Sequence, residues 1–346
     1  MTLKQVAVAE LRETLNQILQ LRGLTAADAA LVAEHYLDAE LRGHRTHGVA
    51  KLITMNQAIV ARGDGPHISS DGGFAIQVDG GRELGPLGAA FCVRTALDRA
   101  AQQGSALVIM RNIGRYGCLY PFGKLIADAG KIGLILNSGG PATVAPPGSY
   151  APILGSNPIC LAFPRRDAES LVIDMATSET AWSHSFLGAV EGYLLQPDTF
   201  FASDGRYTTR PQEARALHPF GGPKGFALCL ALEIICGAFI GGKMGPALKT
   251  DYDCGFVFLA LDPAMFRASA DDYYNEIESF IAEIKAAPLL DGADDIRLPG
   301  EGSEASRRRA LELGYIELDD YTWSLLERMT LDPMTGMNLG VGKGFR

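Results

Sequence analysis

The chain has 346 residues, 47% of them hydrophobic and 21% charged, and 40 acidic against 31 basic residues give a formal net charge of −9. This hydrophobic content and length predict a folded protein with a large core and argue against a disordered chain. The acidic balance argues against a protein that binds nucleic acid or an anionic membrane surface, because both need a basic surplus.

Three further features bear on location. The N-terminus carries charge from its fourth residue and lacks the apolar stretch of a signal peptide. The most apolar segment, residues 226–239, contains Glu233 and is too short to span a bilayer, so it predicts a buried helix. The six cysteines form no Cys-x-x-Cys pair, which favours reduced thiols in a cytoplasmic protein.

The first 86 residues predict helices followed by short strands. Apolar residues at helical spacing predict one helix before residue 22 and a second that begins after Thr25 and ends near Gly43. A third helix is expected over residues 49–61. Residues 63–86 are rich in glycine and aspartate, which predicts turns around one or two strands.

From residue 87 onward, strands alternate with helices, as in α/β proteins. The apolar runs that predict strands are residues 106–110, 132–138, 159–164, 171–178 and 254–263. Helices are expected over residues 87–103, 119–129, 272–286, 303–313 and 318–328. We therefore predict a helical domain from residues 1–80 and 264–346, which joins both chain ends, and an α/β domain over residues 81–263.

The densest group of reactive side chains is LRGHRTHG at residues 41–48. Clustered cations beside an imidazole suit an anionic substrate whose neighbouring carbonyl takes up a proton. The alternative is a solvated basic helix end closed by Gly43. His44 and His47 could share a metal ion, but no third ligand is spaced to match them, so we expect no metal site.

Two other segments are candidate ligand sites. GGPKGF at residues 221–226 places Lys224 at the start of a helix, where the free N–H groups suit a phosphate, although Gly-Pro commonly just begins a helix. Residues 173–183 end a strand in a hydroxyl-rich turn, which either admits a ligand or caps a helix. A nucleotide hydrolase is disfavoured, because residues 237–244 differ from a phosphate loop by Met244 and no Gly-x-Gly-x-x-Gly follows a strand.

Seven segments occur in an order that is specific when taken together. They are RGHRTHGV (42–49), RNIGRYG (111–117), NSGGPATVAPPGS (137–149), LGSNPICLAFP (154–164), IDMATSETA (173–181), GGPKGFAL (221–228) and LPGEGSE (298–304). The chain thereby resembles the malate/L-lactate dehydrogenase family of the non-Rossmann type. That family includes sulfolactate, ureidoglycolate and diketogulonate dehydrogenases and the reductases of piperideine- and pyrroline-2-carboxylate.

The resemblance implies an oxidoreductase that uses NAD or NADP to reduce a small anionic 2-oxo acid or cyclic 2-imino acid by hydride transfer. It implies an α/β fold in which a non-Rossmann mixed-sheet cofactor domain packs against a helical domain formed by both termini. It also implies a homodimer with the active site near the subunit interface.

The resemblance assigns roles to individual residues. His47 corresponds to the acid/base of the family's Ser-His-Gly motif, and Lys51 stands where the family has an arginine for the substrate carboxylate. The substrate residues it implies are Arg42, Thr46, Lys51, Arg115 and Asn157. The cofactor residues it implies are Pro141, Thr143, Asp174, Met175, Ala176, Thr177, Ser178, His184, Lys224, Gly300 and Glu301.

The chain departs from the family pattern in three places. Arg115 replaces a second active-site histidine, which leaves Tyr116 as the next candidate proton donor. The aspartate that orients the catalytic histidine can only be matched to Asp204 by a shift in alignment. Ser183-His184 replaces an expected Gly-Lys. These departures keep a second interpretation open, in which the protein is a cofactor-retaining lyase or a non-catalytic binder.

Overall fold

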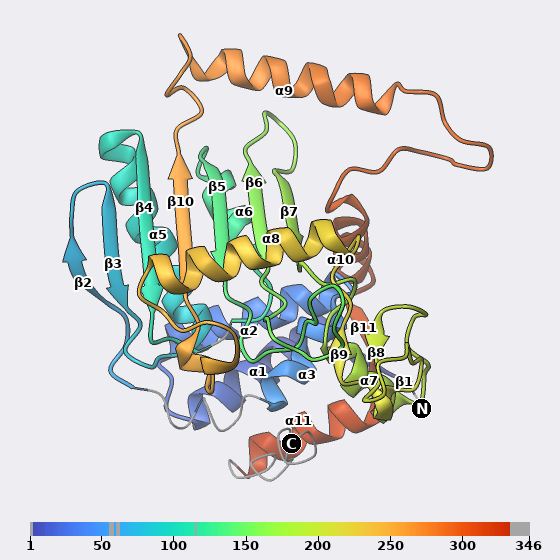
Figure 1. Cartoon of the computed structure of the whole chain (residues 1–346). Helices are drawn as coiled ribbons and strands as arrows, with labels where there is room; N and C mark the ends of the chain where they lie inside the picture. The colour runs from blue at the N-terminus through green and yellow to red at the C-terminus, as the bar shows by residue number, and fades with distance from the viewer. Residues whose placement is uncertain (1–2, 55–58, 60–62, 115, 333–346) are drawn as a thin grey trace.

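The structure is a computed structural model that describes residues 3–54, 59, 63–114 and 116–332. Its centre is a seven-stranded mixed sheet in the order β2-β3-β4-β10-β5-β6-β7, in which β3 and β4 pair in parallel and the other neighbours are antiparallel (Figure 1). The strands are β2 (His67–Asp71), β3 (Ala75–Asp79), β4 (Ser105–Arg111), β5 (Ile132–Asn137), β6 (Ile159–Phe163), β7 (Leu171–Met175) and β10 (Phe256–Leu261). The predicted α/β class with a mixed sheet is confirmed.

Helices cover both faces of this sheet. Side chains alternate along each strand, so Ile135 and Phe258 face a core with α5 (Gly85–Gln103) and α6 (Tyr120–Asp128). Their neighbours Leu136 and Val257 face α8 (Pro223–Ile234), which crosses the other side of the sheet (Figure 1).

The prediction that residues 226–239 form a buried helix is wrong for one side of this segment, which comprises most of α8 and the turn η3 (Ile235–Phe239) that continues it. Leu230, Ile234 and Phe239 are 40%, 48% and 70% exposed, whereas Leu232 and Cys236 are buried against the sheet. The segment is apolar on all sides, but only one side packs against the sheet. An apolar face therefore remains at the surface.

The two ends of the chain meet in one small sheet and one core. β1 (Leu3–Ala7) pairs with β11 (Tyr315–Asp319), and α1 (Val8–Leu21), α2 (Ala26–Leu41) and α11 (Asp320–Leu331) bury their apolar sides together. Thr25 caps α2 as expected, since its hydroxyl accepts a hydrogen bond from the Asp28 amide at 3.2 Å.

The expected boundary at residue 80 is wrong, because β2 and β3 belong to the large sheet rather than to the helices. The segment after residue 263 also divides. α9 (Ala270–Lys285) lies across the end of the sheet, apart from the other terminal helices (Figure 1). Glu278 on α9 forms an ion pair with Arg165, with an N–O distance of 2.7 Å. α10 (Glu301–Leu313) returns toward α2. Within the described residues, no helix is long and apolar enough to cross a membrane.

Candidate active site

The basic turn at residues 41–48 is built on a buried carboxylate. Gly43 follows α2 in the left-handed conformation at φ +80°, which lets the chain reverse into the short helix η1 (Arg45–His47). The Glu40 carboxylate then accepts a hydrogen bond from the Val49 amide at 2.9 Å. A side chain at position 48 would overlap that carboxylate, so glycine is required there and the turn has a fixed geometry.

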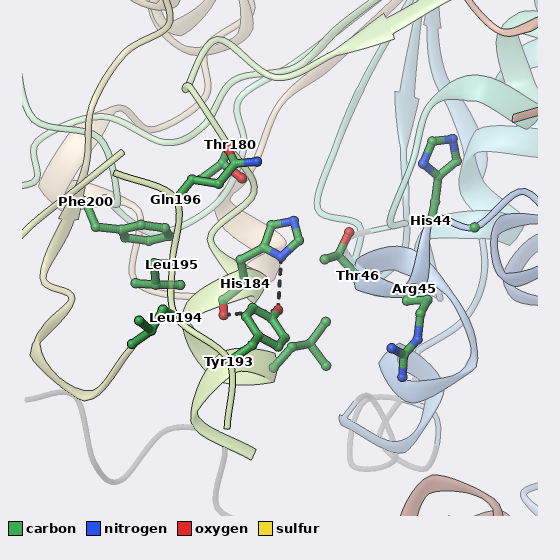
Figure 2. A pocket seen from close by; sticks show the side chains of 12 residues that line it. His44, Arg45, Thr46, Thr180, His184, Tyr193, Leu194, Leu195, Gln196 and Phe200 are labelled. Carbon is green, nitrogen blue, oxygen red and sulfur yellow. Dashed lines mark hydrogen bonds between the residues drawn. The ribbon is translucent and has the colours of Figure 1, made fainter. Parts of the chain in front are cut away.

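A cavity of about 460 Å³ opens between η1 and the segment that contains α7 (Ser183–Glu191) and the residues after it (Figure 2). It is lined by Gly43, His44, Arg45, Thr46, Thr180, His184, Leu187, Tyr193, Leu194, Leu195, Gln196 and Phe200. The turn and the hydroxyl-rich segment that the sequence singled out therefore lie on opposite sides of one space.

His47 adjoins this cavity through Thr46. Its Nδ1 lies 2.9 Å from the Thr46 hydroxyl, and Thr46 is one of the lining residues. Enclosure of the ring by protein, together with the nearby charges of Lys51 and His44, lowers the pKa of His47 to about 3. The imidazole is therefore neutral near pH 7 in the absence of a ligand.

His184 lies on α7 and faces the cavity. Its Nδ1 is 3.1 Å from the Tyr193 hydroxyl, and this pair occupies the middle of the space in Figure 2. The Ser183 hydroxyl donates to the Thr46 carbonyl at 3.4 Å, which holds α7 against the basic turn. His184, predicted as a cofactor residue, thus lines the same cavity as Thr46.

Two candidate cofactor segments meet near the start of α8. The Phe220 amide donates to the Thr177 carbonyl at 3.2 Å, and Ser178 pairs with Pro219, so the turn after β7 lies beside residues 219–225. Lys224 is exposed on the first turn of α8. The Ser178 hydroxyl donates to the Thr180 carbonyl at 2.8 Å, which links this group to the cavity.

Asn157 has a different environment from the substrate role expected for it. It is fully buried, its amide donates to Glu233 Oε2 at 2.6 Å, and its oxygen accepts from the Gly139 amide at 2.7 Å. Its polar atoms are therefore used inside the protein, where they hold the loop after β5 against α8. That loop carries Pro141, which is exposed, and Thr143, whose amide donates to the Leu154 carbonyl at 2.7 Å.

A second cavity of about 210 Å³ lies beyond β7 and is lined by residues that include Tyr120, Val172, Pro299, Gly300, Glu301 and Arg308. Beside it, the Asp174 carboxylate accepts hydrogen bonds from the Leu119 and Tyr120 amides, both at 2.8 Å, at the start of α6. Burial raises the pKa of Asp174 to about 6 despite these bonds. The exposed Met175 and half-buried Ala176 continue from Asp174 toward the larger cavity.

Three predicted residues lie away from the roles given to them. Tyr116 is 1% exposed between the rings of Phe122 and Phe256, burial raises its pKa, and its hydroxyl has no hydrogen-bond partner among the described residues. It is a core residue and not a proton donor to the cavity. Asp204 is exposed and its carboxylate accepts from the Arg206 amide, so the orienting carboxylate expected beside His47 is not supplied there.

Arg42 is the third. It is buried under the turn, where it pairs with Asp38 at 2.6 Å and with Glu304 at 2.7 Å and stacks on the Tyr120 ring. Its charge is balanced by two carboxylates, and it joins α2 to α10 rather than facing the larger cavity. Arg115 lies outside the described residues.

The residues that sequence reasoning missed are in the segment after α7. Tyr193, Leu194, Leu195, Gln196 and Phe200 line the larger cavity. The only local signal is the paired leucines between two polar side chains, and nothing near them in the chain indicates that they face residues 43–46.

Comparisons with known proteins identify the class. A family model described as malate/L-lactate dehydrogenase matches residues 6–327. Hydroxycarboxylate dehydrogenase B of Escherichia coli O157:H7 is 30% identical over 319 residues, which cover 88% of this chain and 87% of that protein. The NAD⁺ ureidoglycolate dehydrogenase of Escherichia coli K12 is 27% identical over 325 residues, or 89% of this chain and 92% of that one. The structure of malate dehydrogenase from Pyrococcus horikoshii matches with a TM-score of 0.84 at 26% identity and 95% coverage of both chains.

The fold and the site thus define a dehydrogenase. The chain belongs to the malate/L-lactate dehydrogenase family, whose members act on hydroxy or oxo acids with a nicotinamide cofactor. The resemblance seen in the sequence motifs is confirmed.

Proposed function

We propose that the protein is an NAD- or NADP-dependent reductase of a small anionic 2-oxo acid or cyclic 2-imino acid, with His47 as the acid/base. The observation that carries this proposal is the contact between His47 and Thr46 at the wall of the cationic cavity. When bound, the nicotinamide supplies the hydride for the carbonyl or imine carbon.

The charges around His47 explain how its proton is controlled. Burial lowers the pKa of His47 most, and the charges of Lys51 and His44 lower it further. A substrate carboxylate held by Arg45, at the cavity wall, and by Lys51 offsets this second contribution. Substrate binding therefore raises this pKa and lets the imidazole hold the proton that the carbonyl oxygen or imine nitrogen receives. The Thr46 hydroxyl is hydrogen-bonded to Nδ1 of His47, so Nε2 of His47 is the atom that exchanges the proton.

The cofactor fits the segments that meet beside α8. Gly221 and Gly222 have φ of +55° and +63°, and no atom lies within 4 Å of where a Cβ of Gly221 would stand, so the main chain before Lys224 is open to a phosphate. The exposed Met175 and the half-buried Ala176 lie between this end and the second cavity, which is lined by Gly300 and Glu301. Gly221 and Lys224 at one end and Gly300 and Glu301 at the other would hold the dinucleotide.

The test is NADH and NADPH oxidation with a panel that includes pyruvate, other 2-oxo acids and cyclic imino acids, together with the cofactor dissociation constants. Turnover of at least one acid supports the proposal. Tight cofactor binding without turnover of any panel member would instead favour a cofactor-retaining lyase or a non-catalytic binder. Thermal stabilisation by ATP alone would overturn both.

We also propose a cytoplasmic homodimer. The apolar outer face of α8 and η3, with Leu230, Ile234 and Phe239 at 40–70% exposure, supports association with a second copy. None of the six cysteines, all of which the structure describes, forms a disulfide, which supports a reducing compartment. Sedimentation velocity of the wild type and of Ile234→Asp tests the dimer, since the variant should be monomeric.

A further inference from the structure

The smaller cavity, of about 210 Å³, lies between the edge strand β7 and α10. Leu171 on β7 lines it from one side, and Glu301 and Arg308 on α10 line it from the other. Its volume is below the roughly 300–1,000 Å³ of a site that encloses a whole drug-sized ligand. The cavity therefore suits one end of an extended dinucleotide rather than all of it.

The carboxylates that line this cavity are already paired, each with a cation from outside its lining. The pairs are Glu169–Lys124 at 3.0 Å, Glu301–Lys285 at 2.7 Å and Glu304–Arg42 at 2.7 Å. Glu301 also accepts a hydrogen bond from the Leu298 amide at 2.8 Å, which closes the turn before α10. A carboxylate is the group that typically binds the ribose hydroxyls of NAD, and these three are engaged in the fold instead.

The two arginines that line the cavity differ in the same respect. Arg165 donates to both carboxylate oxygens of Glu278, at 3.0 and 2.7 Å, so its charge is balanced. Arg308 is exposed on α10, and its guanidinium has no ion-pair or hydrogen-bond partner among the residues that the structure describes. An arginine in this state can donate two parallel hydrogen bonds to a phosphate group.

We propose that Arg308 makes the protein prefer NADPH to NADH, because it binds the 2′-phosphate at the adenosine end of the cofactor. This inference rests on the proposed function and narrows its cofactor. The 2′-phosphate gains charge-assisted hydrogen bonds without breaking an existing ion pair, whereas the 2′-hydroxyl of NADH offers no charge to the guanidinium. Since Arg308 is exposed, neither charge has to lose all of its water.

The experiment measures the dissociation constants of NADPH, NADH, 2′,5′-ADP and 5′-AMP by isothermal titration of the full chain. We expect NADPH and 2′,5′-ADP to bind at least about 10-fold more tightly than their counterparts without the 2′-phosphate. Equal affinities, or tighter binding of NADH, would overturn this inference and leave the proposed function intact. Binding of neither dinucleotide would overturn both.

Arg308→Ala assigns the preference to this side chain. It should weaken NADPH binding by about 10-fold or more and leave NADH binding unchanged, so the two affinities should become similar. Arg309→Ala is the matched control, because Arg309 is the next exposed arginine on α10 and lines neither cavity. An unchanged preference in Arg308→Ala would contradict the inference. An equal loss of affinity for both dinucleotides would also contradict it, since a purely structural role has that effect.

Discussion

His47 differs from an ordinary histidine because protein encloses its ring and cations lie near it. Burial lowers its pKa most, the charges of Lys51 and His44 lower it further, and the expected aspartate at position 204 lies elsewhere on the surface. The orientation of the ring depends instead on the Thr46 hydroxyl. The proton-carrying form of the residue therefore depends on the substrate's own charge, and this couples proton transfer to the binding of an anion.

Replacement of His47 by Asn should lower kcat by roughly 10²–10⁴, the usual contribution of acid–base assistance. The cofactor dissociation constant should stay near the wild-type value, because the cofactor segments are formed by other elements. Steady-state kinetics and fluorescence titration with NADH or NADPH measure the two effects. His67→Asn, at an exposed histidine on β2, is the control. Near-full activity in His47→Asn would transfer the acid/base role to another cavity residue.

Replacement of Lys224 by Ala should weaken cofactor binding by about 10-fold or more, since a charged hydrogen bond to a phosphate is lost. The fold should be unaffected, because Lys224 is exposed at the start of α8. Isothermal titration of both cofactors measures the change, and Lys249→Ala at another exposed lysine is the comparison. Equal dissociation constants for wild type and Lys224→Ala would remove this residue from the cofactor site.

At the scale of elements, the site depends on how α8 is joined to two loops. Glu233 is 2% exposed on α8, and besides accepting from Asn157 it accepts from the Gly245 amide at 2.5 Å. The side-chain oxygen of Asn157 also accepts a hydrogen bond from the Gly139 amide in the loop after β5. The Asn157 side chain therefore connects the buried Glu233 carboxylate on α8 to this loop and holds the loop in place.

Replacement of Asn157 by Ala should lower the free energy of unfolding by about 1–3 kcal/mol, because Glu233 and the Gly139 amide each lose a buried partner. It should also weaken cofactor binding, since the loop after β5 loses its anchor. Urea unfolding and cofactor titration test the two parts. Asn275→Ala, on the exposed side of α9, should change stability by less than about 0.5 kcal/mol. Full stability of Asn157→Ala would show that the network is dispensable.

Most helices and strands could be predicted from the sequence, whereas the order in which the strands pair in the sheet could not. Continuous apolar runs predict β4, β5, β6, β7 and β10 because buried strands need them, and each is found within a few residues of its expected range. The position of β10 between β4 and β5 depends on pairing across distant parts of the chain. The two-residue strands β8 (Phe200–Phe201) and β9 (Ala216–Leu217) are too short to leave a pattern, so the place of Phe200 at the larger cavity could not be predicted.

At the scale of the whole molecule, both ends of the chain enclose one side of the active site. α2 leads directly into the basic turn, and the Arg42–Glu304 pair at 2.7 Å connects it to α10, which begins at the predicted cofactor residue Glu301. The sequence motifs located both segments, but only the buried ion pair shows that they support each other. The stability of the terminal helices and the shape of the site are consequently linked.

Two enclosed histidines make the whole fold sensitive to acid. Burial lowers the pKa of His35 to about 4, and that of His47 is about 3, both below the ordinary value of 6.5. Below pH 6.5 the unfolded chain binds protons at these positions that the folded protein does not bind. Stability therefore falls as the pH drops from about 6.5 toward 4, by up to about 1.4 kcal/mol per pH unit for each histidine.

Asp174 opposes this trend, because its folded pKa of about 6 lies above the ordinary 3.8 and the folded protein gains a proton first. Asp174 therefore offsets the contribution of about one histidine between pH 4 and 6. His35 packs between the rings of Tyr36 and Phe122, so His35→Phe keeps the shape and removes its titration. The free energy of unfolding in urea at pH 7.0 and 5.0 should then fall less in His35→Phe than in the wild type, by up to about 1.4 kcal/mol per pH unit. Parallel pH dependence in the two proteins would mean that His35 titrates normally in the folded state.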